Sequence, residues 1–547
     1  TQGAAQFTIG QSRASDLWGH QVQFSDTVSW STGKHYLRFG GSIVHHTSGG
    51  TGSEPGTAIL GTFTFVNGTK PFDQLTLADV QSYTQPINFG ISSYELPQWL
   101  NTVFVQDNIH LHRDFTLDVG LRYDRQTLTD SKNDFAPRIG FGWHPGGDSR
   151  TSIRGGYAMY YTQIRANAVA GYLVNGLDGL TTYTANPGQT GFPTCLVGSC
   201  LPVALDPKTI PASQLPARDI TIRAGLRDFY REQFARFGLN FDRLPNYPDK
   251  LVNPRSQVIT LGAEREFFKG LFFGADYVHQ HWTNLDRTVD LNAPAPIDRA
   301  TTPTRTVAAA NLTRPILPVN GGVRQVNVIM NLGVADYDGL QTQFSYRGNR
   351  KIYASVSYTL AKATNTFEPD GNGIGPNESH ISALGEIERG PSVVDQRHRA
   401  VITFHYRFPF DITGGTVSMF ASARPFNATT GIDNNGDGIN NDRPFINGAV
   451  LRKSAFRGTA TSDVAAFVEK RFKFSESKAL LLRVEGFNLF NHGNFLGRGV
   501  TTFGTGTTAA PTFGQFAAGV GTSANAIPAF ANIDPPRMFQ LQARFVF

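Results

Sequence analysis

Apolar and polar residues alternate strictly along residues 537–547, the last stretch of the chain. One set of alternate positions holds Phe539, Leu541, Ala543, Phe545 and Phe547, and the other holds Met538, Gln540, Gln542, Arg544 and Val546. A period of two predicts a β-strand, because successive side chains of a strand point to opposite faces. The stretch is about as long as one pass of a tilted transmembrane strand, which needs roughly 9–11 residues.

The apolar face of this strand would suit either the edge of a soluble sheet or the wall of a membrane barrel. A soluble protein normally protects an apolar edge with charge, proline or a covering element. A closed membrane barrel has no edge to protect, and its outer face is apolar. We therefore predict that four side chains face lipid, namely Phe539, Leu541, Phe545 and Phe547. The opposite face, with Arg544, would line the lumen, since an Arg at the bilayer midplane costs roughly 2–4 kcal/mol.

The same alternation recurs in fourteen earlier segments, so we expect fifteen strands in all. The segments are residues 21–30, 35–44, 99–111, 115–125, 135–144, 152–161, 257–267, 271–281, 337–346, 351–362, 396–408, 416–424, 462–474 and 479–490. Because complete bacterial barrels have even strand numbers, fifteen strands would leave two unpaired edges. We therefore expect the C-terminal part of a larger barrel, with residues 1–20 forming an extracellular loop.

Short turns and long polar loops alternate between these segments along the whole chain. The link at residues 145–148 is a tight turn, whereas residues 162–256 form the longest irregular region, with one short helix predicted around Ile220 to Phe237. Outer-membrane barrels have short periplasmic turns and long extracellular loops. If Phe547 lies at the periplasmic side, every short turn falls on that side too. The pattern thus predicts an all-β fold, a transmembrane antiparallel β-barrel.

Composition agrees with this fold and argues against other classes. Charged residues make up 17% of the 547 residues, below the roughly 25% of average soluble proteins, and Gly (57) and Phe (42) are abundant. No run approaches ~18 consecutive apolar residues, and the polar start at Thr1 is not a signal peptide. The net charge is +6, but the basic residues are scattered, so a nucleic-acid partner has little support.

Two features suggest bound metal or covalent cross-links. Cys195 and Cys200 would form a small-loop disulfide in an oxidising compartment, and no second Cys pair supports a metal site instead. An aspartate-rich stretch resembles the first half of an EF-hand calcium loop, with oxygen ligands from Asp433, Asn435, Asp437, Asn441 and Asp442. The twelfth position is Pro444, so the usual bidentate Glu is absent, and an Asx-rich turn is the alternative. Calcium is therefore the one cofactor that the sequence suggests.

No motif of an enzyme is placed by the sequence. The chain contains no Gly-x-Ser-x-Gly elbow and no His-Glu-x-x-His helix, and residues 371–375 lack the Lys-Ser/Thr of a phosphate loop. The charged run 395–399 enters a strand and favours a structural network at the rim over catalysis. The pairs His110/His112 and His279/His281 share strand faces but need no ligand there. We expect no enzymatic activity.

Several segments together resemble one family. TGKHYLRFGG (32–41), VFVQDNIHLHRDFTLDVGLRYD (103–124) and NDFAPRIGFGWHP (133–145) are similar to the middle strands of TonB-dependent receptors. YDGLQTQFSYR (337–347), SYTLAKATN (357–365), DQRHRAVITFHYRFP (395–409), VEGFNLFNHGNF (484–495) and the terminal PRMFQLQARFVF resemble the Oar-like subgroup, which carries an N-terminal carboxypeptidase-regulatory-like domain.

This resemblance implies a 22-stranded barrel of the bacterial outer membrane, plugged by an N-terminal domain, that imports a scarce ligand such as a siderophore, glycan or peptide. Residues 1–547 match only the barrel, and the plug, the TonB-interacting segment, the regulatory-like domain and about seven strands have no counterpart in them. Expected partners are membrane lipid and lipopolysaccharide, the barrel assembly machinery through the terminal Phe547, and TonB through the N-terminal part. The alternative function is surface adhesion or scaffolding by the long loops.

Overall fold

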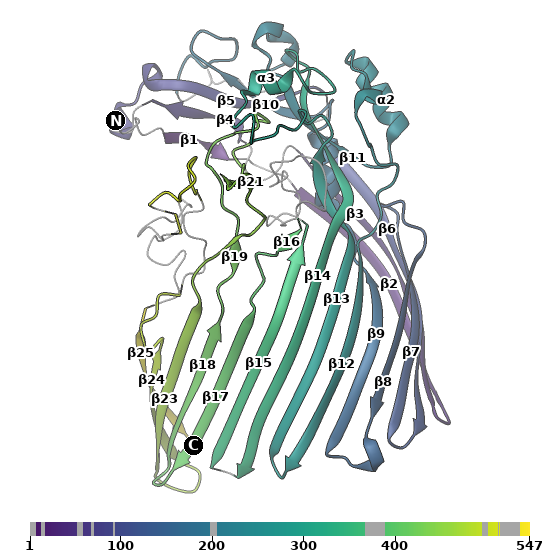
Figure 1. Cartoon of the computed structure of the whole chain (residues 1–547), viewed down its shortest axis with the longest axis vertical. Coiled ribbons are helices and arrows are strands. Elements are labelled where there is room, and N and C mark those ends of the chain that lie inside the picture. Colours follow the sequence, from purple (N-terminus) through teal and green to yellow (C-terminus); the bar gives the residue numbers. More distant parts are fainter. Residues whose placement is uncertain are drawn as a thin grey trace.

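A single large antiparallel sheet forms most of the molecule (Figure 1). The computed structural model describes residues 7–12, 17–51, 58–66, 70–90, 93–196, 205–349, 351–366, 389–494, 502–511, 513–514 and 536–547. The sheet has 17 strands in these residues, two of which, β11 and β16, attach near its upper end. The remaining fifteen confirm the predicted set of long strands and form what we call the wall.

The wall strands follow one another in chain order. They are β2 (Leu17–Thr32), β3 (His35–Thr51), β6 (Ser93–His112), β7 (Phe115–Gln126), β8 (Asp134–Trp143), β9 (Thr151–Tyr161), β12 (Arg255–Phe268), β13 (Leu271–Asp290), β14 (Val323–Asn349), β15 (Ile352–Asn365), β17 (His398–Phe408), β18 (Ile412–Ala421), β23 (Thr461–Lys473), β24 (Ala479–Phe487) and β25 (Met538–Val546). Each pairs antiparallel with the next.

Short turns join the wall strands at one end, and the C-terminus lies at the same end (Figure 1). Gly33 and Gly270 occupy two of these turns with φ values of 56° and 85°. Positive φ costs a residue with a Cβ more than it costs glycine, so these glycines favour the tight reversals. The predicted agreement between the short turns and the position of Phe547 is confirmed.

The register keeps apolar and polar residues on separate faces across the wall. Phe545 stands opposite Leu480 and Leu541 opposite Val484, while Gln542 stands opposite Arg483. On the polar face, ion pairs cross strands β9, β12 and β13, where Arg154 contacts Asp276 at 2.8 Å and Glu264 at 3.2 Å. Since a slip of one residue would exchange the two faces, the alternation fixes the pairing.

The wall is an open sheet. Strand β2 pairs only with β3, and β25 pairs only with β24, so no strand in the described part of the chain covers their outer edges. The two free edges agree with the fifteen predicted strands. None of the helices in the described ranges is both long and apolar enough to cross a membrane.

The long loops fold into a second region, which we call the cap, at the end opposite the short turns (Figure 1). Strands β1 (Phe7–Ser12), β4 (Ala58–Phe65), β5 (Val80–Asn88) and β10 (Leu180–Ala185) form its small sheet. Its helices are α1 (Ala166–Val174), α2 (Arg227–Arg236) and α3 (Val307–Asn311), with short 3-10 turns at Phe72–Gln74, Leu77–Asp79, Pro207–Thr209, Ala212–Gln214 and Phe241–Arg243, while a sixth, Pro145–Gly147, lies in a turn of the wall. The two-residue strands are β16 (Gly390–Pro391), β19 (Pro425–Phe426), β20 (Phe445–Ile446), β21 (Ala449–Val450) and β22 (Phe456–Arg457).

The expectation of an irregular region at residues 162–256 is wrong. Helix α2 lies within the predicted helix, but residues Arg218–Arg223 form strand β11, which pairs in parallel with β14. Ile220 and Ile222 alternate with polar neighbours and are buried against α2, where Tyr230 and Phe234 have 1% and 0% exposure. This packing overrides the helical pattern, because burial of one face of the strand favours a period of two in residues 218–223.

Candidate functional site

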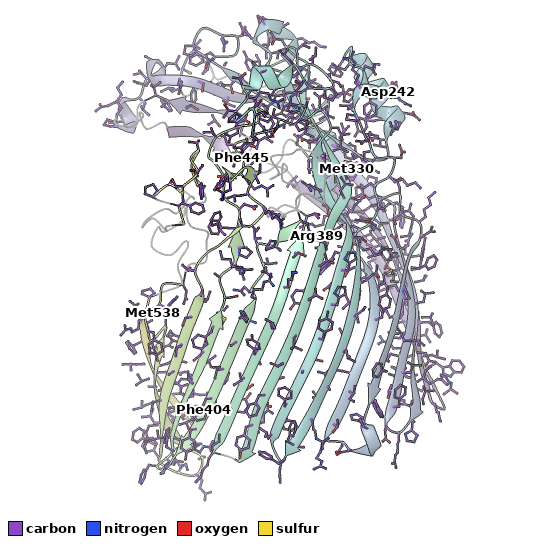
Figure 2. The ribbon with its side chains drawn as sticks, viewed as in Figure 1. Asp242, Met330, Arg389, Phe404, Phe445 and Met538 are labelled. Carbon is purple, nitrogen blue, oxygen red and sulfur yellow. The ribbon has the colours of Figure 1, made fainter. Side chains whose placement is uncertain are left out.

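A cavity of about 690 Å³ lies in the cap between two loops. We call residues 291–322 the proline loop and residues 425–460 the aspartate loop. The ends of β13 and β14 also contribute to the lining, and its larger apolar side chains are Val289, Leu291, Ile297, Met330, Leu332, Phe445 and Val450. Met330 and Phe445 are labelled in Figure 2, above the long strands of the wall. The volume falls within the roughly 300–1,000 Å³ of pockets for small molecules.

Three arginines of the proline loop fasten it to the aspartate loop. Arg314 donates from Nη2 to the carbonyl oxygen of Asp437 at 2.9 Å, and Arg305 donates from Nε to that of Asn435 at 2.9 Å. Arg299 donates to the carbonyl of Arg443. Because guanidinium groups form strong charge-assisted hydrogen bonds, these contacts hold the two sides of the cavity at a fixed distance.

Arg314 also forms an almost fully buried ion pair in the cap. Its Nη1 lies 2.9 Å from Asp290 Oδ2, and the two side chains have 0% and 7% exposure. The second oxygen of Asp290 accepts from the backbone N–H groups of Asn292 and Val326, each at 2.9 Å. With every charge partnered, this pair can remain buried without an orphaned charge.

The predicted calcium residues gather in a compact turn of the aspartate loop. Asp433 Oδ1 accepts from the N–H of Gly436 at 2.7 Å, and Oδ2 accepts from that of Gly438 at 2.8 Å. Asn435 and Asp437 make equivalent local bonds, in which Asn435 Oδ1 accepts from the Asp437 N–H at 2.7 Å. These contacts have the geometry of Asx turns, which need no metal.

Two further members of this set lie at its far end. The Asn441 N–H donates to the Ile439 carbonyl at 2.9 Å, and Asp442 Oδ2 accepts from the N–H of Asn435 at 3.0 Å. Burial raises the pKa of Asp437 and raises that of Asp442 to about 6. In the described part of the chain, no three His, Cys, Asp or Glu residues form a metal-binding group. Calcium binding therefore stays a prediction.

The remaining predicted sites are spread over the molecule. Cys195 is disulfide-bonded, and Cys200 lies outside the described residues. The side chains of Phe539, Leu541 and Phe545 share the apolar face of β25 with 68%, 80% and 53% exposure, and Phe547 follows the strand with 89%. They lie on the wall, far along the chain from the cap cavity.

The other charged motifs form structural pairs. Asp395 contacts Arg397 at 3.0 Å and also pairs with Arg457, as expected for a network at the rim. His279 lies 2.8 Å from Asp338, and His281 lies 2.6 Å from Asp336. The phosphate-loop-like residues 371–375 lie outside the described residues.

Sequence reasoning missed the cavity and its arginines. The three arginines are unevenly spaced in a polar, proline-rich loop, and their acceptors are backbone carbonyls more than a hundred residues away in the chain, 123 residues in the case of Arg314 and Asp437. The only local signal was the density of prolines around Pro294 and Pro296, which limits the freedom of the loop.

Comparisons with known proteins agree with the architecture. A model of the outer membrane beta-barrel domain family matches residues 1–130 and 124–453. The outer membrane transporter YddB from Escherichia coli has a similar structure, with a TM-score of 0.54 and 11% sequence identity over 97% of this chain and 54% of that one. No curated protein sequence matches the chain.

Two receptors are similar at lower TM-scores. The siderophore receptor PirA from Acinetobacter baumannii has a TM-score of 0.49 and 12% identity over 97% of this chain and 55% of its own. A ferric enterobactin receptor, PfeA from Pseudomonas aeruginosa, has a TM-score of 0.47 and 13% sequence identity over 97% of this chain and 54% of its own. The chain thus spans about half the length of the solved structures that it matches.

Proposed function

Because this chain belongs to the outer membrane beta-barrel domain family, we propose that it forms the ligand-binding cap and part of the wall of a TonB-dependent receptor. The family places it in the bacterial outer membrane. In this proposal the cap binds a scarce external ligand and the lumen admits it. The observation that carries the proposal is the separation of polar and apolar faces in register over the whole wall.

The open wall supports the proposal that further strands complete the barrel. Among the described residues, β2 and β25 each have one edge without a partner strand, and the similar transporter is nearly twice as long as the part that this chain covers. An exposed edge inside a bilayer would leave backbone groups unsatisfied, each at a cost of several kcal/mol. Residues 1–547 would then be the C-terminal part of a 22-stranded barrel whose plug and TonB-interacting segment belong to its N-terminal part.

The outer face of the wall would contact lipid and lipopolysaccharide. Phe404, labelled in Figure 2, and the terminal Phe545 belong to this apolar face. Phe547 lies at the same end of the wall as the short turns, and in this proposal the barrel assembly machinery recognises it. Membership of the Oar-like subgroup rests on the sequence resemblance alone.

Adhesion is the second candidate, because the cap has its own buried core and could act as a surface-binding module without transport. The two functions differ in energy coupling. We would measure the depletion of small molecules from the medium by mass spectrometry, using the parent strain, a strain lacking this protein and a strain lacking TonB.

Transport predicts that the same compound persists in the medium of both mutant strains. If every compound is depleted equally by all three strains, the transport proposal is wrong. Loss of surface attachment in the strain lacking the protein, but not in the strain lacking TonB, would then favour adhesion.

A further inference from the structure

The lining of the cap cavity is mainly apolar and conformationally restricted. Prolines at Pro294, Pro296 and Pro315 hold one side, and Leu332 and Phe445 lie among the apolar side chains. Proline fixes its own φ, and the arginine contacts described above fix the opposing loop. A preformed apolar cavity lowers the entropic cost of binding a rigid apolar molecule.

The carboxylates of the lining are already engaged as hydrogen-bond acceptors. Both oxygens of Asp290 accept, one from Arg314 and the other from two backbone N–H groups. Asp298 accepts from its own turn at 2.9 Å and 3.4 Å, and Asp437 accepts from Ile439 at 2.8 Å on one oxygen and from a side-chain amide at 3.2 Å on the other. A ligand cation would therefore find no carboxylate oxygen in the lining without a donor.

The cationic side of the lining is less completely paired. Arg305 is half-buried and uses Nε on the Asn435 carbonyl, while its two Nη groups donate to no acceptor among the described residues. Burial lowers the pKa of Arg305, and the nearby Arg314 lowers it further. Arg299, 8% exposed, lines the same cavity, and burial lowers its pKa as well. The cavity thus offers the unused guanidinium donors of Arg305 beside an apolar surface.

We propose that the cavity binds a small, mainly apolar carboxylate, with its ring or chain among Leu332 and Phe445 and its carboxylate on the Nη groups of Arg305. The planar fork of a guanidinium matches the two oxygens of a carboxylate. An ammonium group could not use the free Nη donors of Arg305, and the lining aspartates Asp290, Asp298 and Asp437 already accept hydrogen bonds within the protein. This proposal adds a ligand class to the proposed function, and it rests on that function only for the uptake of the bound ligand.

Three probes of equal length test the polar end. They are 3-phenylpropionate, 3-phenylpropanol and 3-phenylpropylamine, titrated by calorimetry into the whole protein, purified from outer membranes and held in amphipol. Since a hydrogen bond to a charged group contributes on the order of 1.5–3 kcal/mol, the acid should bind about 10- to 100-fold more tightly than the alcohol. The amine should bind most weakly. Equal binding of the acid and the alcohol, or tightest binding of the amine, would overturn the proposal.

One arginine variant and one matched pair of tryptophan variants locate the binding. Arg305→Gln should bring the affinity for the acid down to that for the alcohol, when both are measured on the same variant. Leu332→Trp fills the cavity and should weaken both, whereas Leu312→Trp, on the exposed part of the proline loop and outside the lining, should weaken neither. If Leu332→Trp and Leu312→Trp bind the acid equally well, the site is elsewhere. These measurements need no uptake, so their failure is distinct from a failure of transport.

Discussion

In the wall, large apolar side chains lie on the outer surface of the sheet, whereas in the cap the same residue types are enclosed. Leu541 and Phe404 of the wall are 80% and 41% exposed, while Leu177 and Phe234 of the cap are fully buried. The cap buries apolar area as a soluble domain does, at about 25 cal/mol per Å². The wall has its apolar face outward, which is stable where lipid replaces water.

The same contrast applies to charge. The wall keeps Arg154 and Asp276 on its polar face with side-chain exposures of 46% and 33%. The cap buries Arg314 and Asp290 almost completely. An exposed pair is screened by water, whereas a buried pair leaves an expensive charge behind when one partner is lost. The wall and the cap of this chain are therefore stabilised in different ways, and substitutions can distinguish the two regions.

The largest effect should follow from placing a charge on the apolar face of the last strand. We expect Phe545→Asp to abolish assembly of the protein in the outer membrane, because it loses roughly 1.5–3 kcal/mol of apolar burial and adds a charge in lipid. Gln542→Asp, on the polar face of the same strand, should assemble normally. Heat-modifiable mobility of the protein recovered from outer membranes measures both. If the two variants assemble equally, Phe545 does not face lipid.

The next effect compares one substitution in the two regions. Arg314→Met should destabilise the cap by about 3–5 kcal/mol, since it leaves Asp290 buried and unpaired. Arg154→Met should cost about 0–1 kcal/mol. Hydrogen exchange should show lost protection in residues 285–330 for the first variant and no comparable change in the wall for the second. Equal effects would show that the two pairs have similar environments.

Helix α2 offers a matched pair inside the cap. Phe234 is fully buried and its ring centroid lies 5.2 Å from that of Phe241, whereas Phe229 on the same helix is 50% exposed. Phe234→Ala should cost about 3 kcal/mol, at the lower end for buried aromatic residues, because a short helix can shift toward the gap. Phe229→Ala should change stability by about 0.5 kcal/mol or less.

Limited proteolysis around residues 225–245 reports the stability of the cap, while heat-modifiable mobility reports that of the wall. We expect Phe234→Ala to accelerate cleavage without changing the mobility. A loss of both signals together would show that the cap and the wall unfold as one unit.

The two regions also differ in what their sequence reveals. Each wall strand has one apolar and one polar face, so a period of two identified all fifteen strands, including β25, and the short turns between them. In the cap, Ile220 to Arg223 carries the same signal over only a few residues, next to the helical pattern of Tyr230 and Phe234. The local pattern was too short to separate strand β11 from helix α2.

The cavity could not be predicted because its contacts are non-local. Arg314 meets Asp437 only after β14 and the following strands place the two loops together. Its acceptor is a backbone carbonyl, which every residue has, so no residue type marks the partner. In contrast, the turn at Asp433 was visible, since its bonds join neighbours within five residues.

The smallest expected effect is that of calcium on the aspartate loop. We predict that chelation loosens residues 426–461, because Ca²⁺ prefers the carboxylate and amide oxygens that Asp433, Asn435 and Asp437 supply. The effect should be modest, since the Asp433 carboxylate already accepts from three backbone N–H groups and Arg314 holds the Asp437 carbonyl at 2.9 Å without metal. Cleavage of the loop by protease, with calcium or with chelator, measures it, and Asp433→Asn should reduce the difference. Equal cleavage rates with calcium and with chelator would show that the Asx turns and the arginine contacts hold this loop without calcium.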